Sequence, residues 1–233
     1  MCIAILNQKN KLNKKYLDNC WKNNPEGAGL LYNNKGKLTV FKSYNKKEFI
    51  KKYYEIREEI NGKIVLHFRI ATSGYEPYIN LHPFLVKKDL GFVHNGIISG
   101  LGDNQYSDTF YFNETLKKFN HKFLECEATE ELICRRINGS KLIFLDDQEK
   151  HKIINEHLGI WDNGDWFSNE SYKSNLSFYF FGNQKVGKQK HNQKDFLCNL
   201  NHQNDFLCFD EFDDLNHFDD LNCIENHFDF KSY

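Results

Sequence analysis

The residue with the clearest chemical potential is Cys2, which directly follows the initiator Met1. Once Met1 is removed, Cys2 carries a thiol and a free α-amine, so a nucleophile and a base belong to the same residue. An α-amine has a pKa of ~7.7–8.0 and can take up a proton near neutral pH. The alternative is that Cys2 is simply a small buried hydrophobic residue. We expect the mature protein to begin at Cys2.

The composition is typical of a globular protein without a charge-driven partner. The 233 residues are 40% hydrophobic and 27% charged, which suits one domain with an appendage. The net charge of -1 predicts neither a nucleic-acid nor a membrane partner. No apolar run approaches the ~20 residues that span a bilayer. The N-terminus lacks a basic region followed by a long apolar core, so we expect no signal peptide. Seven irregularly spaced cysteines argue against a disulfide framework, so we expect a reducing cytoplasm.

The elements that would position Cys2 can be predicted from apolar spacing. Residues 2–6 form an apolar run that predicts a buried strand, which would hold the N-terminus in place. Helices are predicted at about residues 12–21, 46–60, 107–119 and 129–137. Strands are predicted at residues 30–32, 38–41, 64–68, 91–94, 142–145, around Ile153 and at 178–181. Turns are predicted at 33–36, 95–96, 146–147 and 163–164. Grouped helices around many strands predict an α+β fold with antiparallel pairing.

The last fifty residues differ from the rest of the chain. Between Asp195 and Asp229 there are ten acidic residues and no Lys or Arg, and two short segments are duplicated in tandem. We therefore predict a domain of residues 1–182 followed by an acidic, repetitive and largely disordered tail of residues 183–233. A partner-binding tail is the alternative. Its His and Cys residues lack a compact ligand spacing, so no metal site is predicted.

Four stretches occur in a distinctive order: Cys2, Arg69-Ile70-Ala71-Thr72, Asn95-Gly96 and Ser107-Asp108-Thr109. Each is common alone, since Asn-Gly is often only a turn and Ser-Asp-Thr only a helix cap. In this order and separation they resemble class II glutamine amidotransferases, the N-terminal-nucleophile (Ntn) glutaminase family. The resemblance spans residues 2–181. It is strongest to small stand-alone members of the kind found in phage genomes, on residues 24–29, 67–72 and 166–169.

The resemblance implies an Ntn-hydrolase four-layer αββα sandwich with two antiparallel sheets. It also implies hydrolysis of the glutamine side-chain amide to glutamate and ammonia through a thioester, without a cofactor. Cys2 matches the nucleophile, while Asn95 and the backbone N–H of Gly96 match the oxyanion hole. The substrate-binding positions are matched by Arg69 for the α-carboxylate, Asp108 for the α-ammonium, and Gly27, Thr72 and Ser73 as lining residues.

Elementary chemistry is consistent with these roles. Arg presents a planar fork suited to a carboxylate, and a zwitterionic substrate needs one cation and one anion held apart, which Arg69 and Asp108 would supply. An Asn amide and a Gly N–H can donate to the oxygen of a tetrahedral intermediate. Two positions depart from the family, which usually has Gly where Ile3 stands and often His where Ser73 stands.

Two further hypotheses remain open at this stage. An Ntn amidohydrolase acting on another amide would keep Cys2 and Asn95 without needing both Arg69 and Asp108. A non-catalytic module that binds through the acidic tail would leave Cys2, Asn95 and Asp108 without a role. His82 resembles a family His-Pro position and is assigned a supporting role. No nucleotide fingerprint occurs, so we expect either a separate acceptor or synthase subunit to use the ammonia, or simple glutaminase action.

Overall fold

The computed structural model describes residues 2–70, 78–120 and 122–173. Several sequence predictions lie outside these residues: the strand at 178–181, the boundary at 182, the acidic tail, and the site residues Thr72 and Ser73. The two sheets and four helices that follow all belong to the unit of residues 1–178.

A six-stranded antiparallel sheet holds the N-terminal strand at its interior. Its strand order is β3-β2-β4-β1-β10-β9, and β1 pairs with β4 and β10. Every residue of β1 is buried, which confirms the predicted buried first strand. The strands are β1 (Ile3–Asn7), β2 (Ala28–Asn34), β3 (Lys37–Ser43), β4 (Ile64–Phe68), β9 (Ile160–Asp162) and β10 (Asp165–Phe167).

The second sheet is four-stranded and antiparallel, with the order β5-β6-β7-β8. Its strands are β5 (Phe84–Leu85), β6 (Leu90–Asn95), β7 (Lys141–Asp146) and β8 (His151–Ile154). Strand β6 ends at Asn95, where the predicted Asn-Gly turn begins. The two central strands β6 and β7 are paired over six residues up to Asn95, and this pairing fixes the backbone from which the turn begins.

Four α-helices flank the sheets, and each has a recognisable start. Asn13 and Asn45 cap α1 and α2 by accepting backbone N–H groups of the first turn, and Ser107 caps α3 by accepting from Phe110 N at 3.2 Å. The helices are α1 (Lys14–Asn23), α2 (Lys46–Glu59), α3 (Asp108–Leu116) and α4 (Glu127–Ile137), with short 3₁₀ turns η1 (Phe123–Glu125), η2 (Glu156–Leu158) and η3 (Glu170–Tyr172).

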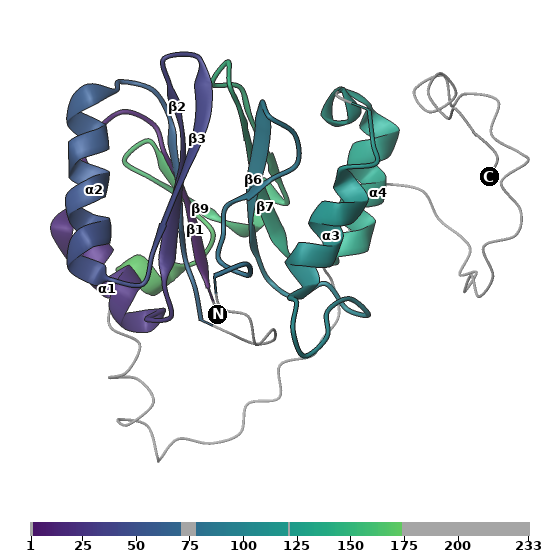
Figure 1. The fold of residues 1–233 in the computed structure, drawn as a ribbon, viewed down its shortest axis with the longest axis horizontal. Helices are drawn as coiled ribbons and strands as arrows, with labels where there is room; N and C mark the ends of the chain where they lie inside the picture. The colour runs from purple at the N-terminus through teal and green to yellow at the C-terminus, as the bar shows by residue number, and fades with distance from the viewer. Residues whose placement is uncertain (1, 71–77, 121, 174–233) are drawn as a thin grey trace, which may run out of the picture. The chain divides into compact units, whose positions relative to one another are not determined.

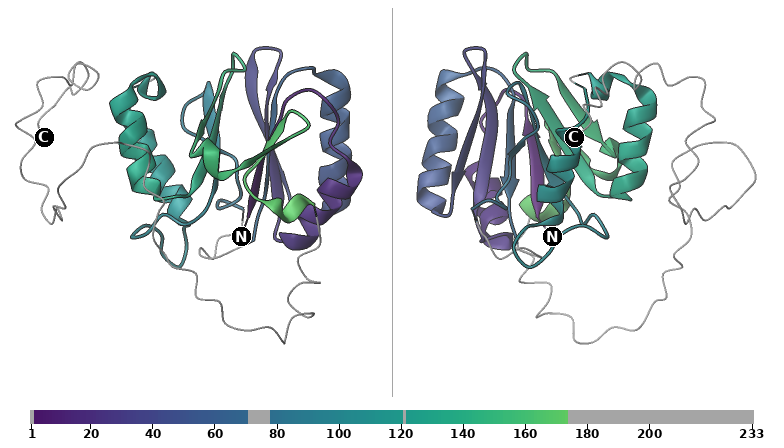
Figure 2. Two further views of the ribbon diagram at one scale, coloured as in Figure 1. Left: turned by 180° about the vertical axis from the view of Figure 1, so that it is seen from behind. Right: turned by 45° about the vertical axis from the view of Figure 1, so that its right-hand side comes forward.

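The elements stack in four layers, helix–sheet–sheet–helix. Figure 1 shows α1 and α2 on one side of the paired sheets and α3 and α4 on the other, and the views of Figure 2 agree. Side chains alternate along β1 as the pleat requires: Ile3 and Ile5 pack toward α1 and α2, whereas Ala4 and Leu6 pack between the sheets. The α+β class with two antiparallel sheets, predicted from the sequence, is confirmed.

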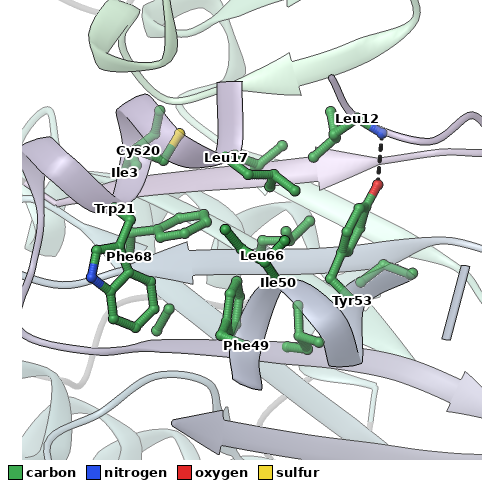
Figure 3. Close-up of a cluster of buried hydrophobic side chains, with 14 of the residues drawn as sticks. Ile3, Leu12, Leu17, Cys20, Trp21, Phe49, Ile50, Tyr53, Leu66 and Phe68 are labelled. Carbon is green, nitrogen blue, oxygen red and sulfur yellow. Dashed lines mark hydrogen bonds between the residues drawn. The ribbon is translucent and has the colours of Figure 1, made fainter. Parts of the chain in front are cut away.

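Three apolar clusters hold the layers together. The first lies under α1 and α2, where Trp21, Phe49 and Phe68 make edge contacts and the Tyr53 hydroxyl accepts a hydrogen bond from Leu12 N at 2.8 Å (Figure 3). The second lies under α3 and α4, and the third fills the space between the sheets. Ile3, the departure from the family pattern, is fully buried in the first cluster.

The helices lie where the sequence predicted them, within about three residues at each end. The strands β5, β9 and β10 were not predicted. They are two or three residues long, too short to show an alternating pattern, although the Asn163-Gly164 turn between β9 and β10 was recognised. Among the described residues, no helix is long and apolar enough to cross a membrane.

Candidate active site

Cys2 immediately precedes β1 and is held by the Ile70 backbone and by the Asn169 side chain. Its Sγ lies 3.3 Å from the carbonyl oxygen of Ile70 and 3.4 Å from the Ile70 amide nitrogen. Asn169 Nδ2 donates to the Cys2 carbonyl oxygen at 2.7 Å. Burial raises the pKa of the Cys2 thiol, and the Ile70 amide, the chain's N-terminal amine and the Arg69 charge only partly oppose this. The resting group is therefore a thiol that needs a base before it can attack.

Arg69 follows the last residue of β4 and is fixed by a backbone pair with the 26–27 turn. Arg69 N donates to Gly27 O at 2.8 Å, and Glu26 N donates to Arg69 O at 3.1 Å. Gly27 has a φ of +111°, and a Cβ there would lie 2.8 Å from Leu81 Cδ2, so the turn requires glycine. The Arg69 side chain is buried, with Nη1 3.7 Å from Glu26 Oε2. A buried guanidinium in this setting suits a carboxylate ligand.

The Asn95-Gly96 turn is built around a glycine that no other residue could replace without strain. Gly96 has a φ of +149°, and a Cβ on it would lie 2.0 Å from Ser140 Oγ. Ser140 Oγ also accepts from Ile97 N at 3.1 Å, so the backbone is pressed against this hydroxyl. Asn95 is 3% exposed, and its Nδ2 lies 2.6 Å from Ser168 Oγ. These contacts therefore fix the backbone of the turn and the side chain of Asn95.

Asp108 occupies the first position of α3 and is already held by the backbone. Its Oδ2 accepts from Ile98 N at 2.6 Å, and its Oδ1 accepts from Thr109 N at 2.7 Å and Thr109 Oγ1 at 3.2 Å. A carboxylate in the first turn also interacts favourably with the helix dipole. Two carboxylate oxygens offer about four acceptor positions, so capacity for a substrate ammonium remains.

One cavity joins these segments. Four predicted site residues lie on its wall: Cys2, Arg69, Gly96 and Asp108. Two predicted residues, Asn95 and Gly27, do not line it. Asn95 directly precedes Gly96 in the chain, and Gly27 instead supports the Arg69 backbone. The sequence did not predict six further lining residues: Ile70, Asn80, His82, His94, Ser107 and Thr109.

The cavity wall includes part of a cluster of three buried histidines. His82, which was assigned a supporting role, itself lines the cavity, and its ring centroid lies 4.0 Å from that of His67. His67 Nε2 lies 3.0 Å from His94 O, so this nitrogen is the donor, and His94 Nδ1 lies 2.7 Å from Thr109 Oγ1. Burial lowers the pKa of His67 to about 3, that of His94 to about 4, and that of His82 well below its usual value.

His82 and His94 thus contribute uncharged rings to the cavity wall. The sequence marked His82 through its His-Pro resemblance, and it placed His67 and His94 next to recognised motifs, at Arg69 and at Asn95. Within the described part of the chain, no three His, Cys, Asp or Glu side chains are grouped so that they could hold a metal ion. The site offers a thiol, a cation, a carboxylate and amide donors for chemistry.

Comparisons with known proteins found one distant relative and several solved structures of limited similarity. No family model matches the chain. An uncharacterized protein of Methanocaldococcus jannaschii is 24% identical over 144 residues, which cover 58% of this chain but only 39% of that relative. Among solved structures, a glutamine phosphoribosylpyrophosphate amidotransferase from B. subtilis has a TM-score of 0.47 and 16% identity, covering 72% of this chain and 41% of that one.

A second solved structure, a glutamine aminotransferase class-II domain protein from Silicibacter pomeroyi, has a TM-score of 0.41 and 12% identity. The matched region covers 87% of that chain and 72% of this chain. Both identities are below 25% and both TM-scores are below 0.5, so neither structure assigns a role to a residue of this chain.

Proposed function

We propose that this chain hydrolyses the side-chain amide of glutamine to glutamate and ammonia, with Cys2 as an N-terminal nucleophile. The observation that carries the proposal is the convergence of Cys2, Arg69, Gly96 and Asp108, from four separate segments, on one cavity. A thiol, a guanidinium, a backbone turn and a carboxylate are the groups that such a reaction on an amino-acid substrate needs. A core built only for packing would not gather these polar groups around a cavity.

Recognition of glutamine follows from the two opposite charges. The Arg69 guanidinium would bind the α-carboxylate with paired N–H donors, and the Asp108 carboxylate would accept from the α-ammonium. Both side chains are pinned through their backbones or by backbone donors, so little conformational entropy would be lost on binding. The joint presence of both charges on the wall favours an α-amino acid over another amide.

The covalent step begins with removal of Met1, which exposes the α-amine of Cys2. That amine would take the thiol proton, and sulfur would attack the amide carbon of glutamine. The Gly96 N–H and the Asn95 amide would stabilise the oxyanion. On collapse, the proton passes from the amine to the departing nitrogen, which leaves as ammonia, and a γ-glutamyl thioester remains. Water then hydrolyses the thioester to glutamate and restores the thiol.

The direct test is a glutaminase assay combined with mass spectrometry of the intact chain. Cys2→Ala should abolish ammonia release, whereas Cys134→Ala should not, because the Cys134 thiol contacts Asn155 and lies outside the cavity. Wild-type protein mixed rapidly with glutamine and quenched in acid should carry a γ-glutamyl adduct on Cys2. Active protein that fully retains Met1, or equal activity in Cys2→Ala, would disprove the mechanism.

We further propose that a separate subunit or acceptor uses the ammonia. Glutamine hydrolysis without an acceptor would waste substrate, so turnover should be slow in the isolated chain and rise when the acceptor-binding partner is present. The test is to compare glutamine turnover of the isolated chain with that of the complex purified from its native cell. High turnover in isolation, with no co-purifying protein, would instead indicate a free-standing glutaminase.

A further inference from the structure

Ser168 joins two parts of the candidate site that belong to different sheets. It follows β10, the neighbour of β1 in the six-stranded sheet, and its side chain is 1% exposed. Its Oγ accepts from Ala4 N in β1 at 2.9 Å and lies 2.6 Å from Asn95 Nδ2 at the end of β6. One hydroxyl therefore contacts the strand that carries Cys2 and the side chain proposed as an oxyanion donor.

In the described part of the chain, two polar groups at this contact lack a partner. Ser168 Oγ accepts two hydrogen bonds, from Ala4 N and Asn95 Nδ2, and its own proton has no acceptor there. Asn95 Oδ1 is buried and has no hydrogen-bond donor among these residues. A buried acceptor without a donor is unfavourable, so a native arrangement should avoid it.

Rotating the Asn95 amide by 180° gives the Ser168 proton an acceptor and leaves the two amide protons, in place of the carbonyl oxygen, without a partner among the described residues. Oδ1 then faces Ser168 and accepts its hydroxyl proton, and a distance of 2.6 Å is ordinary for an O–H···O bond but short for an N–H···O bond. Ser168 Oγ still accepts from Ala4 N. The amide nitrogen moves to the position where Oδ1 had no partner and presents its two protons there.

We propose that Ser168 is a positioning residue that holds Asn95 by its carbonyl oxygen, so that the Asn95 N–H₂ group faces the oxyanion that forms during glutamine hydrolysis. This inference rests on the proposed function. Ser168 touches neither substrate nor reacting atoms; it acts through Asn95. Because the same hydroxyl accepts from Ala4, two residues after Cys2, it also sets the spacing between the nucleophile strand and the oxyanion donor. The bond would thereby keep the two sheets in register at the site.

The test is a double-mutant cycle on kcat for glutamine hydrolysis. Asn95→Ala should lower kcat by roughly 10²–10³, as for other oxyanion donors. Ser168→Ala should lower kcat roughly tenfold with little change in KM, the rate equivalent of one ordinary hydrogen bond. In the Asn95→Ala background, Ser168→Ala should have no further effect. Alkylation of Cys2 by iodoacetamide needs no oxyanion donor, so its rate should not change.

A matched control is Ser171→Ala in the same segment. Ser171 is also buried, but its hydroxyl has no partner, so this variant should keep the wild-type kcat. Fully additive losses in the cycle would overturn the inference, since Ser168 would then act through Ala4 and the β1 backbone. A wild-type kcat in Ser168→Ala would overturn it as well. Wild-type protein that releases no ammonia and forms no thioester would instead refute the proposed function.

Discussion

Acidification should unfold this protein through its three buried histidines. His67, His82 and His94 are at most 5% exposed, and burial holds the pKa of each below the usual 6.5. In the unfolded chain each ring takes up a proton as the pH falls through about 6.5, while in the folded protein each stays neutral. The unfolded state therefore binds more protons, and the free energy of unfolding falls as the pH drops below 6.5.

The magnitude follows from the difference in proton binding. At pH 5.5 an unfolded histidine is about ten-elevenths protonated, which costs the folded state about 1.4 kcal/mol for each ring that remains neutral. Three rings together should lower the free energy of unfolding by about 4 kcal/mol relative to pH 7.5. For a domain whose total stability is about 5–15 kcal/mol, this is a large share. The contribution of His94 should level off as the pH falls through its folded-state pKa of about 4, and that of His67 as the pH falls through about 3.

Urea denaturation at pH 7.5, 6.5, 5.5 and 5.0 would measure this dependence directly. Near pH 5 the slope should correspond to about three protons taken up on unfolding, and in His82→Asn to about two. His157→Asn is the control, because His157 is exposed and its replacement should leave the slope unchanged. A wild-type slope below about one proton would refute the assignment of three neutral buried rings.

Three further outcomes are expected at the site. Gly96→Ala should destabilise the fold by roughly 1–3 kcal/mol and abolish turnover, because the added Cβ would lie 2.0 Å from Ser140 Oγ. Urea denaturation would measure the loss of stability, and a glutaminase assay would measure the loss of turnover. Arg69→Lys keeps the charge but loses the planar fork, so KM for glutamine should rise more than kcat falls in steady-state kinetics. Asp108→Asn should reduce discrimination against glutamine analogues that lack the α-amine, measured as a ratio of kcat/KM values. Unchanged selectivity in both recognition variants would favour another amide substrate.

The local features of this protein could be predicted from the sequence because they depend on near neighbours. The apolar run after Cys2 predicted a buried strand, and β1 is buried along its whole length. The Ser107 cap predicted where α3 begins, and the Asn163-Gly164 pair predicted a turn. Chain order and spacing were also sufficient to single out Cys2, Arg69, Asn95, Gly96 and Asp108, since these motifs are read along the chain. Together these features led to the fold class and to a candidate set of residues.

The tertiary structure alone decided which side chains meet. Ser168 and Asn95 are 73 residues apart and belong to segments of different sheets. The stretch 166–169 carries part of the family resemblance, but it does not indicate that Ser168 contacts Asn95. The histidine cluster likewise joins β4, β6 and the segment before β5, and only burial makes its rings neutral. Gly27, expected at the cavity, instead holds the backbone of Arg69. These contacts depend on sheet register and on the stacking of one sheet against the other, which no short-range pattern in a single sequence encodes.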